Sequence, residues 1–166
     1  MKVYFSHGKE SGPWGTKITR LAAIAGQLEC EVDSIDYTDT MDPELRVERL
    51  LTALGKETGS FVLAGSSMGG YVSLVASESV DAEGVFLMAP ALYCPGFKMQ
   101  RYHSKSPHIE IVHGWSDDII PADHSIRYAR DTGCTLHLID EDHSLNGSLE
   151  LVASLFERFL AQAMKG

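Results

Sequence analysis

Three residue types in this chain occur in an order that could activate a serine as a nucleophile. Ser67 is the centre of a Gly-x-Ser-x-Gly pattern, between an apolar run and a stretch with helical spacing. Asp117 and His143 each follow a later apolar run. A serine hydroxyl is a weak nucleophile unless a base, itself oriented by an acid, takes its proton. The pattern therefore predicts attack by Ser67 on an acyl carbon, with His143 as base and Asp117 as its orienting acid.

The glycines at 65 and 69 favour a sharp turn from a strand into a helix. Such a turn presents the serine oxygen above the sheet, and it crowds the two flanking positions. The start of the helix also offers free amide groups that favour negative charge. Ser66 lacks glycines at this spacing, so we interpret it as a turn residue.

Neighbouring residues offer alternatives to these roles. Asp118 lies beside Asp117, but the motif spacing favours Asp117, and we expect Asp118 to cap a helix or to face solvent. His7 and His113 each precede a glycine at the end of a strand, where we expect them to hold loops. We predict no metal and no cofactor, because no known zinc motif matches the spacing of the residues that would have to bind a metal: His108, His113, Asp117 and His124.

The apolar periodicity predicts the elements that would position these residues. Strands are expected at 2–6, 30–36, 60–65, 84–90, 108–114 and 135–140. Helices are expected at 16–29, from Pro43 to about 54, and at 68–79, 121–132 and 149–164. Strands that alternate with helices favour a parallel sheet covered on both faces. The one long irregular segment, 90–107, is a candidate functional loop.

Composition restricts the class of protein. The 166 residues suit a single domain, 1–166, and the net charge of −9 argues against a nucleic-acid partner. No apolar run approaches the roughly 20 residues of a membrane span. Three widely spaced cysteines, Cys30, Cys94 and Cys134, favour reduced thiols and a cytoplasmic location. The sequence leaves the oligomeric state open.

Four segments resemble the α/β-hydrolase superfamily, in particular its compact, capless bacterial serine hydrolases. They are "VYFSHGKESGPWGTK", "VLAGSSMGG", "IVHGWSDDIIP" and "DEDHSL", the last with Asp140 where the family more usually has glycine. The resemblance implies an α/β fold with three αβα layers. It also implies a mostly parallel six-stranded sheet in the order 2-1-3-4-5-6, with no large cap. By the same resemblance, the backbone amides of Lys9 and Met68 would form an oxyanion hole.

The resemblance implies hydrolysis of an ester or thioester of a small-molecule acyl substrate through an acyl-serine. Glu10, Trp14, Tyr93 and Phe97 are candidates for substrate contact, although core packing is as good an interpretation for the tryptophan. Two other functions remain open at this point. One is a binding protein without catalysis on the same fold, and the other is an amidase or peptidase with the same triad.

Overall fold

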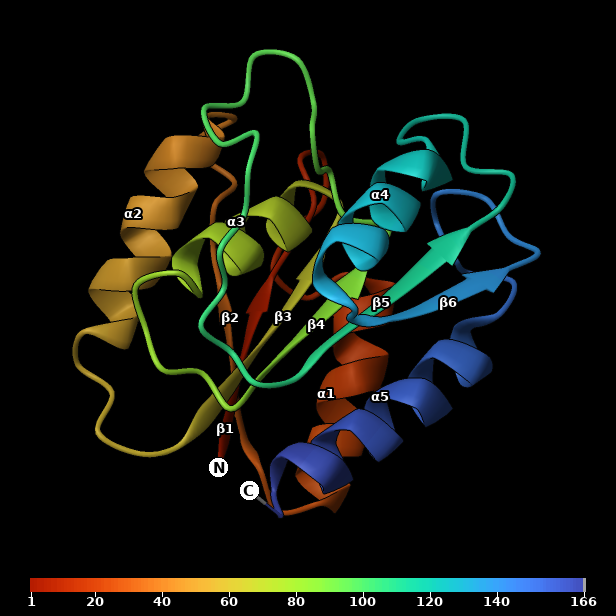
Figure 1. Ribbon diagram of the computed structural model, residues 1–166. Helices are drawn as coiled ribbons and strands as arrows, with labels where there is room; N and C mark the ends of the chain where they lie inside the picture. The colour runs from red at the N-terminus through yellow and green to blue at the C-terminus, as the bar shows by residue number, and fades with distance from the viewer. Residues whose placement is uncertain (166) are drawn as a thin grey trace.

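The computed structural model describes residues 1–165 and contains one six-stranded sheet (Figure 1). The strands are β1 (Lys2–Ser6), β2 (Glu31–Ile35), β3 (Phe61–Ser66), β4 (Gly84–Met88), β5 (Ile109–Gly114) and β6 (Thr135–Ile139). The helices are α1 (Thr16–Gln27), α2 (Pro43–Leu54), α3 (Met68–Ala76), α4 (Ala122–Thr132) and α5 (Leu149–Ala163). Every predicted element is present, and its ends lie within a few residues of the prediction.

The strands pair in the order β2-β1-β3-β4-β5-β6, and every pairing is parallel. This confirms the predicted sheet order. Because all the strands run the same way, the loops that follow them emerge at one edge of the sheet. The segments after β1, β3, β5 and β6 are the four that carry the candidate site residues.

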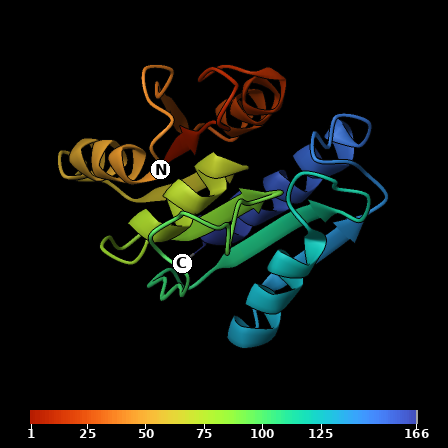
Figure 2. The same cartoon turned by 90° about the horizontal axis from the view of Figure 1, so that it is seen from above.

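Helices cover both faces of the sheet. Helices α2, α3 and α4 lie on one face, and α1 and α5 lie on the other (Figure 1 and Figure 2). Helix α1 packs on the sheet through one apolar face, because its buried side chains recur at helical spacing: Ile18, Leu21, Ile24 and Ala25. Helix α2 begins where Asp42 accepts hydrogen bonds from the Glu44 and Leu45 amides and Pro43 fills the first turn.

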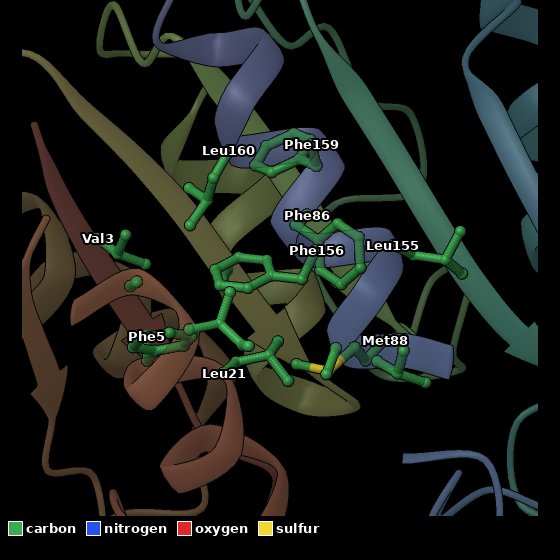
Figure 3. Close-up of a cluster of buried hydrophobic side chains, with 14 of the residues drawn as sticks. Val3, Phe5, Leu21, Phe86, Met88, Leu155, Phe156, Phe159 and Leu160 are labelled. Atoms are coloured by element: carbon green, nitrogen blue, oxygen red, sulfur yellow. The ribbon is translucent and has the colours of Figure 1, made fainter. Parts of the chain in front are cut away.

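An aromatic cluster forms the core beneath α1 and α5. Phe156 lies 5.9 Å from Phe5 and 5.2 Å from Phe86, ring centre to ring centre (Figure 3). All three side chains are fully buried, and burial of a phenylalanine contributes roughly 1.5–3 kcal/mol. This packing fixes α5 against β1 and β4, and the loop that precedes α5 carries His143.

The segment 90–107 contains no helix or strand, as the sequence indicated. It is nonetheless anchored to the helices beneath it. Tyr102 is buried, and its hydroxyl accepts from the Tyr93 amide and donates to the Met99 carbonyl. The Met99 amide in turn donates to the hydroxyl of Tyr71 in α3. The segment is therefore a folded loop that packs on α3.

No helix within residues 1–165 is both long and apolar enough to cross a membrane.

Candidate active site

Ser67 lies at the sharp turn between β3 and α3. Its backbone has φ 54° and ψ −119°, a conformation that a residue with a side chain rarely adopts. Backbone hydrogen bonds to residues distant in the sequence hold it there. The Ser67 amide donates to the Met88 carbonyl at 2.9 Å, and the Ser67 carbonyl accepts from the Ala91 amide at 2.9 Å. Strand β4 and the segment that follows it thus hold the serine in a strained conformation.

Gly65 and Gly69 are required because backbone passes too close for a side chain. A Cβ atom at Gly65 would overlap the backbone of Gly69. A Cβ atom at Gly69 would overlap the carbonyl of Ser6 at the end of β1. The crowding that the sequence predicted at these two positions is present.

His143 bridges Ser67 and Asp117. Its Nε2 lies 3.0 Å from Ser67 Oγ, and its Nδ1 lies 2.7 Å from Asp117 Oδ2. A carboxylate can only accept, so Nδ1 carries the proton and Nε2 is left to accept from the serine hydroxyl. The structure therefore brings together the serine, histidine and aspartate, which lie up to 76 positions apart in the sequence.

Asp117 is held by more than His143. Its side chain is fully buried, and its Oδ1 accepts from the amides of Ile119 at 2.9 Å and Ile120 at 2.8 Å. Burial alone raises the pKa of this carboxyl. The hydrogen bonds from Ile120, His143 and Ile119 outweigh that effect and leave the pKa below its ordinary value. Asp117 is accordingly an anion next to His143.

A second histidine, His113, contacts the same carboxylate oxygen. Its Nε2 lies 3.0 Å from both Asp117 Oδ2 and the Ile120 carbonyl, so this nitrogen must carry the proton. Its Nδ1 then accepts from the Ser125 hydroxyl at 2.7 Å. Burial lowers the pKa of His113, which keeps the ring neutral. His113 therefore holds a loop, as expected, and that loop is the one that carries Asp117.

The loop after β1 lies against Ser67. A Cβ atom at Gly8 would lie 3.6 Å from the Cβ of Ser67, so the chain at 8–9 passes directly beside the serine. Within residues 1–165, the amides of Lys9 and Met68 donate to no other protein group. Both residues line the pocket that contains Ser67. The amides of these two pocket residues are therefore candidates for an oxyanion hole.

A pocket of about 680 Å³ opens over Ser67 and His143. Glu10 and Phe97 are in its lining, together with Ile119 and Ile120 from the segment before α4. The lining therefore includes both apolar and charged side chains.

Two of the predicted substrate contacts lie outside this pocket. Trp14 is not in the lining, and 52% of its surface is exposed. Tyr93 is also absent from the lining. Its ring packs against Tyr102, with centroids 5.3 Å apart, and the Arg127 guanidinium lies 4.0 Å from its centre. The prediction for both residues rested on residue type in a loop, and type alone does not give side-chain direction.

Lys17 is a pocket residue that the sequence interpretation missed. It belongs to α1, is half-buried, and its Nζ donates to the Ser144 carbonyl at 2.6 Å. Burial lowers its pKa, and the nearby charges of Asp142 and Asp117 oppose this. Nothing in the sequence of α1 marks this lysine, since its contact depends on a loop 127 positions away.

The residues weighed as metal ligands are in other environments. Among residues 1–165, no group of three or more His, Cys, Asp or Glu side chains is arranged to hold a metal ion. The His108 ring stacks on Phe159 at 5.0 Å, and the His124 ring contacts Tyr93 at 6.0 Å.

Comparisons with solved structures agree with this architecture, whereas a comparison with curated protein sequences gave no significant match. Among solved structures, a Xanthomonas campestris pv. campestris protein assigned to the α/β-hydrolase superfamily is 32% identical. The match has a TM-score of 0.90 and covers 97% of this chain and 98% of that one.

Two more distant structures share the fold. Est1E from Butyrivibrio proteoclasticus is 16% identical with a TM-score of 0.83, over 99% of this chain and 88% of that one. A lid-less α/β serine hydrolase from Xanthomonas campestris is 18% identical with a TM-score of 0.69, over 96% and 81%. At these identities the likeness concerns the fold alone.

The family pattern that matches the chain covers residues 1–108. This range contains Lys9 and Ser67 but ends before Asp117 and His143, so the site geometry adds information that the family match does not. The chain has a hydrolase fold of the α/β superfamily, and it belongs to the uncharacterised protein family UPF0227.

Proposed function

We propose that the protein is a serine hydrolase that cleaves carboxylic esters or thioesters of small molecules through an acyl-serine intermediate. The observation that carries this proposal is the position of His143, within hydrogen-bond reach of both Ser67 Oγ (3.0 Å) and Asp117 Oδ2 (2.7 Å). A non-catalytic binding protein has no need for this alignment. Proton transfer from a serine to a histidine requires it.

The first half of the reaction forms the acyl-enzyme. Ser67 Oγ attacks the carbonyl carbon as its proton moves to His143 Nε2, and the carbonyl oxygen becomes an anion. The Lys9 and Met68 amides stabilise this anion. Its collapse breaks the bond to the leaving group, which takes the proton from His143 as an alcohol or thiol.

The second half uses water in the same way. His143 takes a proton from water, the hydroxide attacks the acyl carbon, and the second tetrahedral anion collapses to release the acid. Ser67 Oγ regains its proton from His143. Asp117 remains ionised throughout and stabilises the imidazolium that forms twice in the cycle.

The pocket suits an acyl group of moderate size. Its lining includes the apolar side chains of Phe97, Ile119 and Ile120. It also includes three charged residues: Lys9, Glu10 and Lys17. With about 680 Å³ available, the pocket has room for an acyl chain against these apolar side chains while its carbonyl is directed to Ser67.

Active-site labelling tests the proposal. A fluorophosphonate probe should phosphonylate wild-type protein at Ser67 with loss of fluoride, and Ser67→Ala should not react. Ser66→Ala is the matched control, since the adjacent serine belongs to β3 and is buried; it should still be labelled. Equal labelling of wild type and Ser67→Ala would exclude Ser67 as the nucleophile, and absence of labelling in both would favour the binding function.

A substrate panel then decides the bond type. Matched acetyl and butyryl esters, thioesters and anilides should be hydrolysed with the esters or thioesters fastest. A faster anilide reaction would instead identify an amidase.

A further inference from the structure

Arg46 is a buried cation whose hydrogen bonds, within residues 1–165, all go to backbone carbonyls, and its guanidinium also lies 5.3 Å from the centre of the Tyr37 ring. It lies in α2, and its side chain has no solvent exposure. Within residues 1–165, no carboxylate lies within 4.0 Å of it. Its guanidinium donates instead to the carbonyls of five residues: His7, Gly8, Lys9, Tyr37 and Thr40. A buried charge without a counter-ion is costly, so its position needs an explanation.

Three of those carbonyls belong to the loop beside Ser67. The Arg46 Nη1 lies 3.3 Å from the His7 oxygen and 3.1 Å from the Gly8 oxygen, and Nη2 lies 3.3 Å from the Lys9 oxygen. One planar, rigid guanidinium therefore fixes three successive peptide groups of this loop.

His7 holds the same Gly8 carbonyl from a second direction. Its Nε2 accepts from the Tyr37 amide at 3.0 Å, so this nitrogen carries no proton. Its Nδ1 must then carry the proton, and it donates to the Gly8 oxygen at 2.8 Å. The Gly8 carbonyl thus accepts two hydrogen bonds, one of them from a cation.

The N–H of this peptide group belongs to Lys9. No peptide bond in residues 1–165 is cis, and in a trans peptide the N–H points opposite to the C=O. Because Arg46 and His7 hold the Gly8 carbonyl, they also fix the direction of the Lys9 N–H, which points away from both side chains. That N–H is one of the two free donors beside Ser67. Hydrogen bonds to a carbonyl also polarise its peptide group, which makes the N–H a stronger donor.

We propose that Arg46 and His7 are positioning residues for the oxyanion hole. By binding the Gly8 carbonyl, these two side chains orient and polarise the Lys9 amide. The inference rests on the proposed serine-hydrolase function. The competing explanation is a structural one, in which Arg46 only attaches the 37–40 loop to α2 through hydrogen bonds to the Tyr37 and Thr40 carbonyls.

Arg49 provides a matched control. It lies one turn further along α2 and also binds that loop, with Nη1 2.7 Å from the Asp36 carbonyl and 2.6 Å from Asp39 Oδ1. Its hydrogen bonds go to Asp36 and Asp39, and none goes to residues 7–9. If Arg46 only attached this loop to α2, replacement of either arginine should have a similar effect on kcat.

The kinetic experiment compares Arg46→Lys, Arg46→Met and Arg49→Met on one ester, with rates expressed per fluorophosphonate-titrated site so that unfolded protein is not counted. Complete removal of an oxyanion donor typically lowers kcat about 10²- to 10³-fold. For Arg46→Met, which leaves the amide present but free to turn, we expect a fall of about 10-fold or more with KM within about twofold. Arg46→Lys keeps the charge and should recover part of kcat. Arg49→Met should keep wild-type kcat.

A second measurement needs only wild-type protein. On formation of a boronate adduct at Ser67, the NMR resonances of the Lys9 amide and the Arg46 guanidinium should shift together, while those of Arg49 stay in place. An unchanged Arg46 signal beside a shifted Lys9 signal would overturn the inference. So would wild-type kcat per site in a folded Arg46→Met. A wild type that neither hydrolyses esters nor reacts at Ser67 would instead overturn the proposed function itself.

Discussion

His113 and Asp117 share a hydrogen bond of 3.0 Å from Nε2 to Oδ2, at the same carboxylate oxygen that faces His143. Two imidazoles therefore meet one oxygen. His113 is buried on β5 and also donates to the Ile120 carbonyl, so Asp117 cannot rotate without breaking contacts on both sides. The aspartate that would orient the base is itself oriented by a histidine.

Replacement of Asp117 by asparagine should lower kcat about 10³- to 10⁴-fold, with folding retained. The amides of Ile119 and Ile120 would retain the side-chain oxygen. The new NH₂ group would then take the place of Oδ2, where it faces His143 and no longer accepts from His113 Nε2. His143 would then protonate on Nε2 and could no longer accept from Ser67. Asp118→Asn is the control, because Asp118 is exposed, and it should keep activity within about twofold. Equal losses in both variants would contradict the assignment of the acid.

The free energy of unfolding should fall as pH is lowered from about 7 towards 5. Burial lowers the pKa values of both His7 and His113 from the ordinary 6.5. The unfolded chain therefore binds protons at these positions before the folded one does. Stability from this source is complete above the unfolded pKa and decreases below it.

Urea unfolding across this pH range measures the effect. His113→Gln should make the free energy of unfolding depend less steeply on pH. His103→Gln, at an exposed position, should leave this dependence unchanged. A wild-type stability that stays level or rises as the pH falls through this range would contradict the prediction.

Gly69→Ala should destabilise the protein by about 1–3 kcal/mol or more and abolish labelling at Ser67. Its Cβ would meet the backbone of Ser6, which cannot move without shifting β1. Gly26→Ala is the opposite control. That glycine is inside α1 with open space around it, so alanine should stabilise by up to about 1 kcal/mol. Thermal unfolding of the two variants would check both signs.

Lys17→Met should lower the free energy of unfolding by about 1.5–3 kcal/mol, the usual worth of a hydrogen bond to a charged group. It removes the bond from Lys17 Nζ to the Ser144 carbonyl, directly after His143. The loosened His143 loop should also reduce kcat about fivefold. Lys56→Met, at an exposed position just after α2, should change neither quantity. Wild-type stability in Lys17→Met would mean that the bond does not hold this loop.

The prediction of the fold from the sequence is confirmed, and the sequence also singled out Ser67, Asp117 and His143, whose side chains the structure brings together. Apolar runs bounded by glycine and proline marked the strands, and Gly65 and Gly69 marked the turn at Ser67. Asp117 and His143 could be placed because parallel strands bring their following loops to one edge of the sheet.

The rest depended on contacts that no local pattern carries. Arg46 has the sequence surroundings of an exposed helical arginine, and only the arrangement of α2 beside the 7–9 loop reveals its burial. Residue type alone suggests Trp14 and Tyr93 as substrate contacts, whereas packing sets the direction of their side chains.

The strand order has an electrostatic consequence. Asp117 follows β5, and Arg46 belongs to the helix that follows β2, so a buried anion and a buried cation lie on opposite flanks of β3 and Ser67. Together they produce an electric field across the serine. In the proposed reaction, positive charge develops at His143 beside the anion. Negative charge develops on the substrate's carbonyl oxygen, beside the amide that the cation polarises. The field therefore has the direction that favours this charge separation before any substrate arrives. A carbonyl probe attached at Ser67 would report it as a shift in vibrational frequency that diminishes in Arg46→Met.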